Sequence, residues 1–127
     1  MTDFEEIPGK RRIEGRDLPT VWPELGEDCE INQFYRRSDC ASGFIGEGYL
    51  EIWNRGFLDT ANESAAAAYP PKFRFFASDG GGNMFGVTLR GGRPLYLSAP
   101  NIGDEGDIRY FDTWSALLTA IRDFDYI

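Results

Sequence analysis

The sequence contains no histidine and only two cysteines among its 127 residues. Without an imidazole, Ser-His-Asp and Cys-His catalysis and histidine-ligated zinc sites are excluded. Cys29 and Cys40 are too few for a zinc site made of thiolates alone. If one helix carried both, they would share a face roughly 16 Å apart, beyond disulfide reach, so we expect free thiols. The sequence therefore predicts a protein that is not an enzyme and that needs neither a metal nor a cofactor.

Long apolar segments are also missing. The longest run, residues 65–69, is five residues of mostly alanine, whereas a bilayer-spanning helix needs roughly 20. The first six residues are acidic and lack the basic start and apolar core of a secretion signal. We therefore expect a cytoplasmic protein with no membrane partner.

Positive charge is scarce, because 13 basic residues face 21 acidic ones and the net charge is -8. This charge opposes a polyanionic partner, so nucleic-acid binding is not expected. The acids gather toward the two ends: residues 1–35 hold nine acidic and four basic groups, and residues 101–127 hold six and two. They form either a solvated surface or an electronegative face that steers a basic protein partner.

Length and composition predict one domain over residues 1–127. The hydrophobic share of 42% and the aromatic share of 15% are enough for a compact core. Residues 1–17 are expected to form an irregular arm, because proline and glycine interrupt any helical period there. Val21 and Trp22 are expected to anchor this end of the chain to the body.

Hydrophobic periodicity predicts alternating helices and strands. The expected helices cover 28–39, 55–68 and 114–124, and the expected strands cover 49–53, 73–77, 84–89, 95–98 and a short extended piece at 108–111. Because the strands form a hairpin-linked group, we expect an α+β fold: a single antiparallel sheet of about four to six strands packed by helices.

The dipeptide Gly91-Gly92 predicts a tight hairpin, since a primed turn needs positive φ at both central positions. The expected cross-strand pairs are Val87 with Tyr96, Thr88 with Leu95, and Leu89 with Pro94. Pro94 suggests a strand start or an edge. Asp112 or Thr113 is expected to cap the last helix, whose apolar face is Trp114, Leu117, Leu118, Ile121 and Phe124.

The hexapeptide 78–83 is the most unusual motif in the chain. A phosphate-binding loop would require Lys-Ser or Lys-Thr and a helix after the glycines, and neither is present. Calcium binding is a weaker alternative, because the spacing of acids misses the usual loop pattern. A strand-to-strand turn is therefore favoured, with a structural motif made of Asp79, Gly80, Gly81, Gly82 and Asn83.

Two further features have open interpretations. Asp104, Glu105 and Asp107 form a carboxylate cluster that either serves a hydrolase or lies in a solvated loop, and the loop is favoured. Trp53 ends a strand, where its indole either closes the core or lines a groove. The remaining aromatic residues at regular spacing are expected in the core: Phe73, Phe75, Phe85, Trp114 and Phe124.

Several segments together resemble the SUKH superfamily, which unites bacterial toxin-immunity proteins with fungal cell-wall synthesis regulators of the Smi/Knr type. The resemblance spans roughly residues 18–124, and the strand 49–53 and the block 78–83 contribute most of it. The other similar segments are 34–39, 43–48, Asn62-Glu63, Tyr69-Pro70 and 111–118. The chain differs at residues 1–17, where family members have a long helix, and at Asp39-Cys40, where they often have asparagine and glycine. The resemblance implies a mixed fold with a cleft for protein partners and no catalytic residues.

Our leading hypothesis from the sequence is a non-enzymatic immunity protein that binds and neutralises a basic toxin domain. The alternative is a regulatory scaffold in cell-wall, glucan or envelope metabolism, and the third option is a hydrolase using the acidic loop. Carboxylates would speed the encounter, and exposed aromatic side chains would anchor the complex. The expected partner-binding residues are Trp22, Glu24, Glu27, Asp28, Trp53, Asp104, Glu105 and Asp107.

Overall fold

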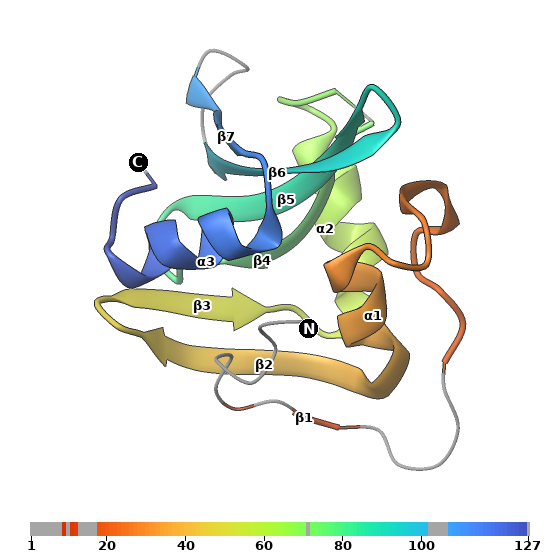
Figure 1. Cartoon of the computed structure of the whole chain (residues 1–127), viewed down its shortest axis with the longest axis horizontal. Coiled ribbons are helices and arrows are strands. Elements are labelled where there is room, and N and C mark those ends of the chain that lie inside the picture. The colour runs from red at the N-terminus through yellow and green to blue at the C-terminus, as the bar shows by residue number, and fades with distance from the viewer. Residues whose placement is uncertain (1–8, 10, 13–17, 71, 102–106, 127) are drawn as a thin grey trace.

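The computed structural model describes residues 9, 11–12, 18–70, 72–101 and 107–126 (Figure 1). Its strands are β1 Arg11–Arg12, β2 Ser38–Ile45, β3 Gly48–Ile52, β4 Arg74–Ser78, β5 Asn83–Arg90, β6 Arg93–Pro100 and β7 Arg109–Phe111. Its helices are α1 Glu30–Arg37, α2 Leu58–Ala65 and α3 Trp114–Arg122, with 3-10 turns η2 Pro23–Leu25 and η3 Arg55–Phe57. None of the described helices is long and apolar enough to cross a membrane.

The strands form one antiparallel sheet in which each strand pairs with its neighbour in the sequence. The six strands β2–β7 make up the sheet, and the two-residue β1 extends it beside β2. This is the expected α+β single-domain fold. Most of the expected irregular arm lies outside the described residues, but Arg11–Arg12 of that arm form β1.

Helices cover both faces of the central strands. Helices α1 and α3 lie in front of the sheet in Figure 1, and α2 lies behind β4 and β5. The larger core cluster packs residues of α1 and α3 on one face, and a smaller cluster packs Ala65 of α2 with Tyr69 on the other. Consecutive residues such as Phe75 and Phe76 therefore enter different clusters, as period-two alternation requires.

The β5–β6 hairpin has the predicted register. Residue pairs are Val87 with Tyr96, Thr88 with Leu95, and Leu89 with Pro94. Gly91 and Gly92 both have positive φ, at 59° and 77°, as the primed turn requires. Pro94 lies in the part of β6 that β7 does not reach, since β7 pairs only with residues 96–98, so this stretch of β6 is locally an edge.

Several predicted helix boundaries were wrong. The helix expected over 28–39 ends at Arg37, and the following residues 38–45 form β2, which their small and polar side chains did not indicate. The residues of β2 have a low intrinsic preference for strands. Pairing with β3 at five positions provides the hydrogen bonds that stabilise the extended conformation. The helix expected over 55–68 begins with η3 and ends at Ala65, ahead of the proline pair.

The last helix begins as predicted but ends earlier. The Thr113 hydroxyl accepts a hydrogen bond from the Ala116 N–H at 3.0 Å, so Thr113 is the cap. Phe124, expected on the buried face, is 54% exposed because it lies past the helix end at a φ of 54°. The chain turns there, and Tyr126 enters the core in its place, with its ring 5.0 Å from that of Phe85.

Candidate functional site

Residues 21–30 form a short protruding segment that we call the acidic ridge. It contains four carboxylates and no lysine or arginine. Pro23 starts the η2 turn, and Gly26, at a φ of 87°, ends it in a conformation that favours glycine. Glu24, Glu27 and Asp28 are exposed, so the local turn directs like charges into solvent.

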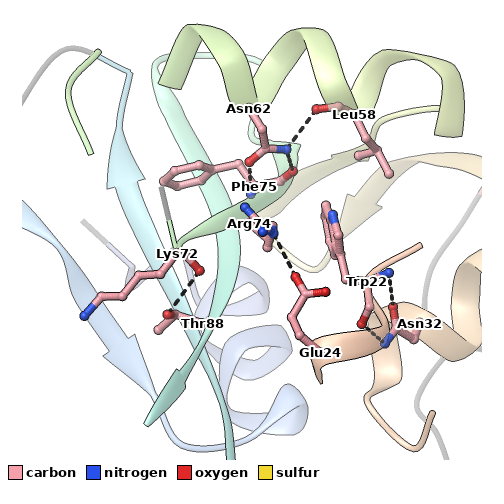
Figure 2. A network of polar contacts seen from close by, with 9 residues as sticks. All are labelled: Trp22, Glu24, Asn32, Leu58, Asn62, Lys72, Arg74, Phe75 and Thr88. Carbon is pink, nitrogen blue, oxygen red and sulfur yellow. Dashed lines mark hydrogen bonds and ion pairs between the residues drawn. The ribbon is translucent and has the colours of Figure 1, made fainter. Parts of the chain in front are cut away.

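A buried asparagine on α1 holds the ridge in place. Asn32 is 0% exposed, and its Nδ2 donates to the carbonyl oxygens of Trp22 at 2.9 Å and Gly26 at 2.8 Å. Its Oδ1 accepts from the Trp22 N–H at 3.2 Å (Figure 2). The amide side chain thus replaces the backbone partners that this irregular segment lacks. The backbone that carries the carboxylates is consequently held in one position by Asn32.

The ridge separates two hollows in the surface. The first, which we call the α2 hollow, has a volume of about 480 Å³ and lies between the ridge and α2. Glu24 reaches it from the ridge and forms an ion pair with Arg74, 3.0 Å between Oε2 and Nε (Figure 2). Asp59 and Glu63 line it from α2. Its carboxylates outnumber its one arginine by three to one.

Helix α2 is fixed over β4 by a second asparagine. Asn62 Nδ2 donates to the carbonyl oxygens of Leu58 and Phe75, both at 2.9 Å, and its Oδ1 accepts from the Phe75 N–H at 2.8 Å (Figure 2). This clamp sets the distance between α2 and the sheet. It therefore gives the α2 hollow a defined wall.

The second hollow, which we call the hairpin hollow, has a volume of about 740 Å³ and lies between the ridge, the β5–β6 hairpin and the start of α3. Glu27, Asp28 and Glu30 line it from the ridge and Asp112 from the link between β7 and α3, while Arg90 and Arg93 line it from the hairpin. Carboxylates outnumber guanidinium groups here as well.

Burial and hydrogen bonding perturb two groups at the floor of the hairpin hollow. The Tyr96 hydroxyl donates to Glu30 Oε1 at 2.8 Å and lies 3.4 Å from the Cys29 Sγ. Burial, together with the hydrogen bond to Glu30, raises the pKa of Tyr96 far above its ordinary value. Burial also raises the pKa of the Cys29 thiol. Both side chains are therefore neutral at pH 7 and contribute to the packing of the core.

The structure brings together only part of the predicted binding set. Glu24, Glu27 and Asp28 share the ridge, as the sequence indicated by their proximity. Trp22, expected as an exposed anchor, is only 9% exposed, because its backbone bonds to Asn32 place the indole in the core. The expectation that Val21 and Trp22 anchor this end of the chain is thereby confirmed.

The remaining predicted residues lie elsewhere. Trp53 is half-buried and lines a third hollow away from the ridge. Its indole therefore both packs against the core and lines a groove, the two positions that the sequence left open. Asp104 and Glu105 lie outside the described residues, and Asp107 is exposed. In the described ranges no three acidic or cysteine side chains come close enough to hold a metal ion.

Sequence reasoning missed three acids that face the hollows, namely Asp59, Glu63 and Asp112. The spacing of Asp59 and Glu63, four residues apart on a predicted helix, placed them on one face and was the available signal. Asp112 was considered only as a helix cap. Its position near the ridge follows from the packing of α3 on the sheet, which no local pattern encodes.

The hexapeptide 78–83 is the turn of the β4–β5 hairpin, as predicted. Asp79 Oδ1 accepts from the N–H groups of Gly81, Gly82 and Asn83 at 2.8–3.1 Å. Its Oδ2 accepts from the Tyr126 hydroxyl at 2.8 Å and from the Asn83 side chain at 3.1 Å. Burial alone would raise the pKa of Asp79, but these hydrogen bonds lower it overall. The carboxylate therefore ties the turn to the C-terminal segment.

No family model and no curated protein matches the chain.

Proposed function

We propose that this protein is a binding domain that captures a basic protein partner on the acidic ridge and the two hollows beside it. The observation that supports this best is the placement of Glu24, Glu27 and Asp28 on one protruding segment whose backbone is clamped by Asn32. Further carboxylates face the same region from α2 and from the link before α3. Charge of one sign on a fixed, protruding scaffold suits the recognition of a cationic protein surface.

Electrostatic steering and preorganisation are the two physical contributions. With a net charge of -8 for the chain, the ridge adds a local field that raises the encounter rate of a basic partner. Because the ridge is already ordered by hydrogen bonds to Asn32, binding does not have to order it. The hollows on either side can accept side chains of the partner.

We further propose that the partner is a toxin and that binding neutralises it, as in immunity proteins. This step rests on the sequence resemblance to the SUKH superfamily and on the acidic surface together. The same surface would serve a regulatory scaffold, so the partner's activity has to distinguish the two roles.

Co-expression with the product of the neighbouring gene tests the proposal. We expect that product to arrest growth when expressed alone, to be harmless with this protein, and to co-purify with it. The variant Glu27→Gln/Asp28→Asn should weaken both protection and co-purification. Both side chains are exposed, so the fold should be retained.

The matched control is Glu47→Gln/Asp123→Asn, which removes the same charge from exposed positions in the β2–β3 turn and at the end of α3, outside both hollows. A neighbour that is harmless alone would overturn the immunity role. Equal loss of binding in the two double variants would overturn the assignment to the ridge, because net charge alone would then explain the effect.

A further inference from the structure

The outer face of the β2–β3 hairpin is a second surface, separate from the acidic ridge. The inward residues Leu50 and Ile52 pack in the larger core, and α2 covers the other side of the sheet only over the later strands. The outer side of β2 and β3 thus has no helix of the described chain over it. Phe44 on this face is 70% exposed and makes an edge contact with Tyr49, 5.2 Å between ring centroids.

A hollow of about 420 Å³ lies on this outer face. Trp53 and Phe57 form its aromatic side, with an edge-to-face contact of 5.4 Å between ring centroids. Phe57 is 42% exposed, which is unusual for a phenylalanine, and Trp53 is half-buried. Glu51 precedes Trp53 by two residues, so the carboxylate and the indole lie on the same side of the chain, and both line the hollow.

Glu51 is the only charged group among the residues that line this hollow. Among the residues that the structure describes, the Ser78 hydroxyl is the group that hydrogen-bonds to this carboxylate, at a long 3.4 Å. The nearby Arg55 directs its guanidinium away, donating to the carbonyl oxygens of Tyr35 at 2.6 Å and Pro19 at 2.8 Å. Within the described part of the chain, the hollow therefore combines aromatic faces with a carboxylate that has no positively charged partner.

We propose that this hollow receives an arginine side chain from a segment of another protein. A guanidinium stacks on an indole and at the same time donates to a carboxylate, which the pairing of Trp53 with Glu51 allows. The exposed pair of Phe44 and Tyr49 extends the contact along the hairpin for apolar side chains beside that arginine. Another copy of this chain is disfavoured, because each copy carries a net charge of -8.

Titration with the blocked peptide Ac-Gly-Arg-Gly-Arg-Gly-NH2, followed by the indole N–H signals in 1H–15N spectra, tests this inference. Trp53 is half-buried, whereas Trp22 and Trp114 are 9% and 2% exposed and serve as internal references. We expect the Trp53 signal to shift and the other two to stay. The lysine peptide should shift it less, and the neutral citrulline peptide should have no effect.

The variant Glu51→Gln should weaken arginine-peptide binding roughly three-fold or more while retaining the fold, because this side chain is exposed. Glu47→Gln, which removes an exposed carboxylate at the hairpin turn outside the hollow, is the matched control and should change nothing. The inference would be overturned if the Trp53 signal did not shift, or if the citrulline or lysine peptide shifted it as much as the arginine peptide. An unchanged affinity of Glu51→Gln for the arginine peptide would overturn it as well.

This test is independent of the proposed function. Glu27→Gln/Asp28→Asn should leave the Trp53 response to the peptide unchanged, since neither residue lines this hollow. If those ridge substitutions abolish the response and Glu51→Gln does not, the outer-face site is wrong and the ridge proposal stands. If Glu51→Gln alone weakens the response, the outer-face site holds whatever the neighbouring gene encodes.

Discussion

Replacing Asn32 with alanine is expected to destabilise the fold and to loosen the acidic ridge. The side chain is 0% exposed and takes part in three hydrogen bonds with the ridge backbone. Each buried hydrogen bond contributes about 1 kcal/mol, so their loss should lower the free energy of unfolding by about 3 kcal/mol. The estimate includes the Trp22 N–H, which would be left in the interior without its acceptor.

Urea unfolding followed by tryptophan fluorescence measures this change as a lower midpoint at constant slope. Gln33→Ala, one position along α1 at a half-buried site, is the control and should cost less than about 0.5 kcal/mol. Hydrogen exchange gives a second readout, because the N–H groups of Leu25 and Cys29 bond to the ridge carbonyls that Asn32 also holds. If Asn32→Ala lowered the free energy of unfolding by less than about 1 kcal/mol and its ridge amides exchanged as in the control, Asn32 would not be what holds the ridge backbone.

Three further predictions concern other parts of the fold. A Cβ at Gly48 would lie 1.9 Å from a backbone oxygen of α3, so Gly48→Ala should cost about 3 kcal/mol or more in urea unfolding. Gly82→Ala, with nothing within 4 Å, should stay within about 0.5 kcal/mol, and equal costs would contradict the contact. Because hydrogen bonds lower the pKa of Asp79, its stabilisation is present above about pH 4 and is lost as the pH falls through the folded pKa. The wild type should therefore lose more stability on acidification than Asp79→Asn, and equal losses would show that the carboxylate is not engaged. Burial raises the pKa of the Cys29 thiol, so an aromatic disulfide reagent should modify half-buried Cys40 first, and two fast thiols in the native protein would disprove that placement.

The elements that the sequence predicted well are those with a strong local signal. Between two apolar runs, Gly91-Gly92 is typical of a two-residue hairpin turn with positive φ at both positions. This turn defined the hairpin and its register. Trp114 begins a helix with a regular apolar stripe, and that stripe is buried up to Ile121. Strand β2 had no such signal, because its small and polar residues become a strand only by pairing with β3.

The candidate site was only partly predictable for a related reason. The carboxylates of the ridge are close in the sequence, so their grouping could be expected. The role of Asn32 could not, because its hydrogen-bond partners lie six and ten residues earlier in an irregular segment. The hollows arise where the ridge meets α2, α3 and the β5–β6 hairpin, and those meetings depend on tertiary packing.

The most direct test of the central claim, that the ridge attracts a basic protein, is the salt dependence of the association rate with the neighbouring gene's product. For the wild type we expect this rate to fall steeply between about 20 and 300 mM salt, because screening removes electrostatic steering. Glu27→Gln/Asp28→Asn should associate more slowly at low salt and show a flatter dependence than Glu47→Gln/Asp123→Asn. Identical rates and slopes for the two double variants would contradict the account.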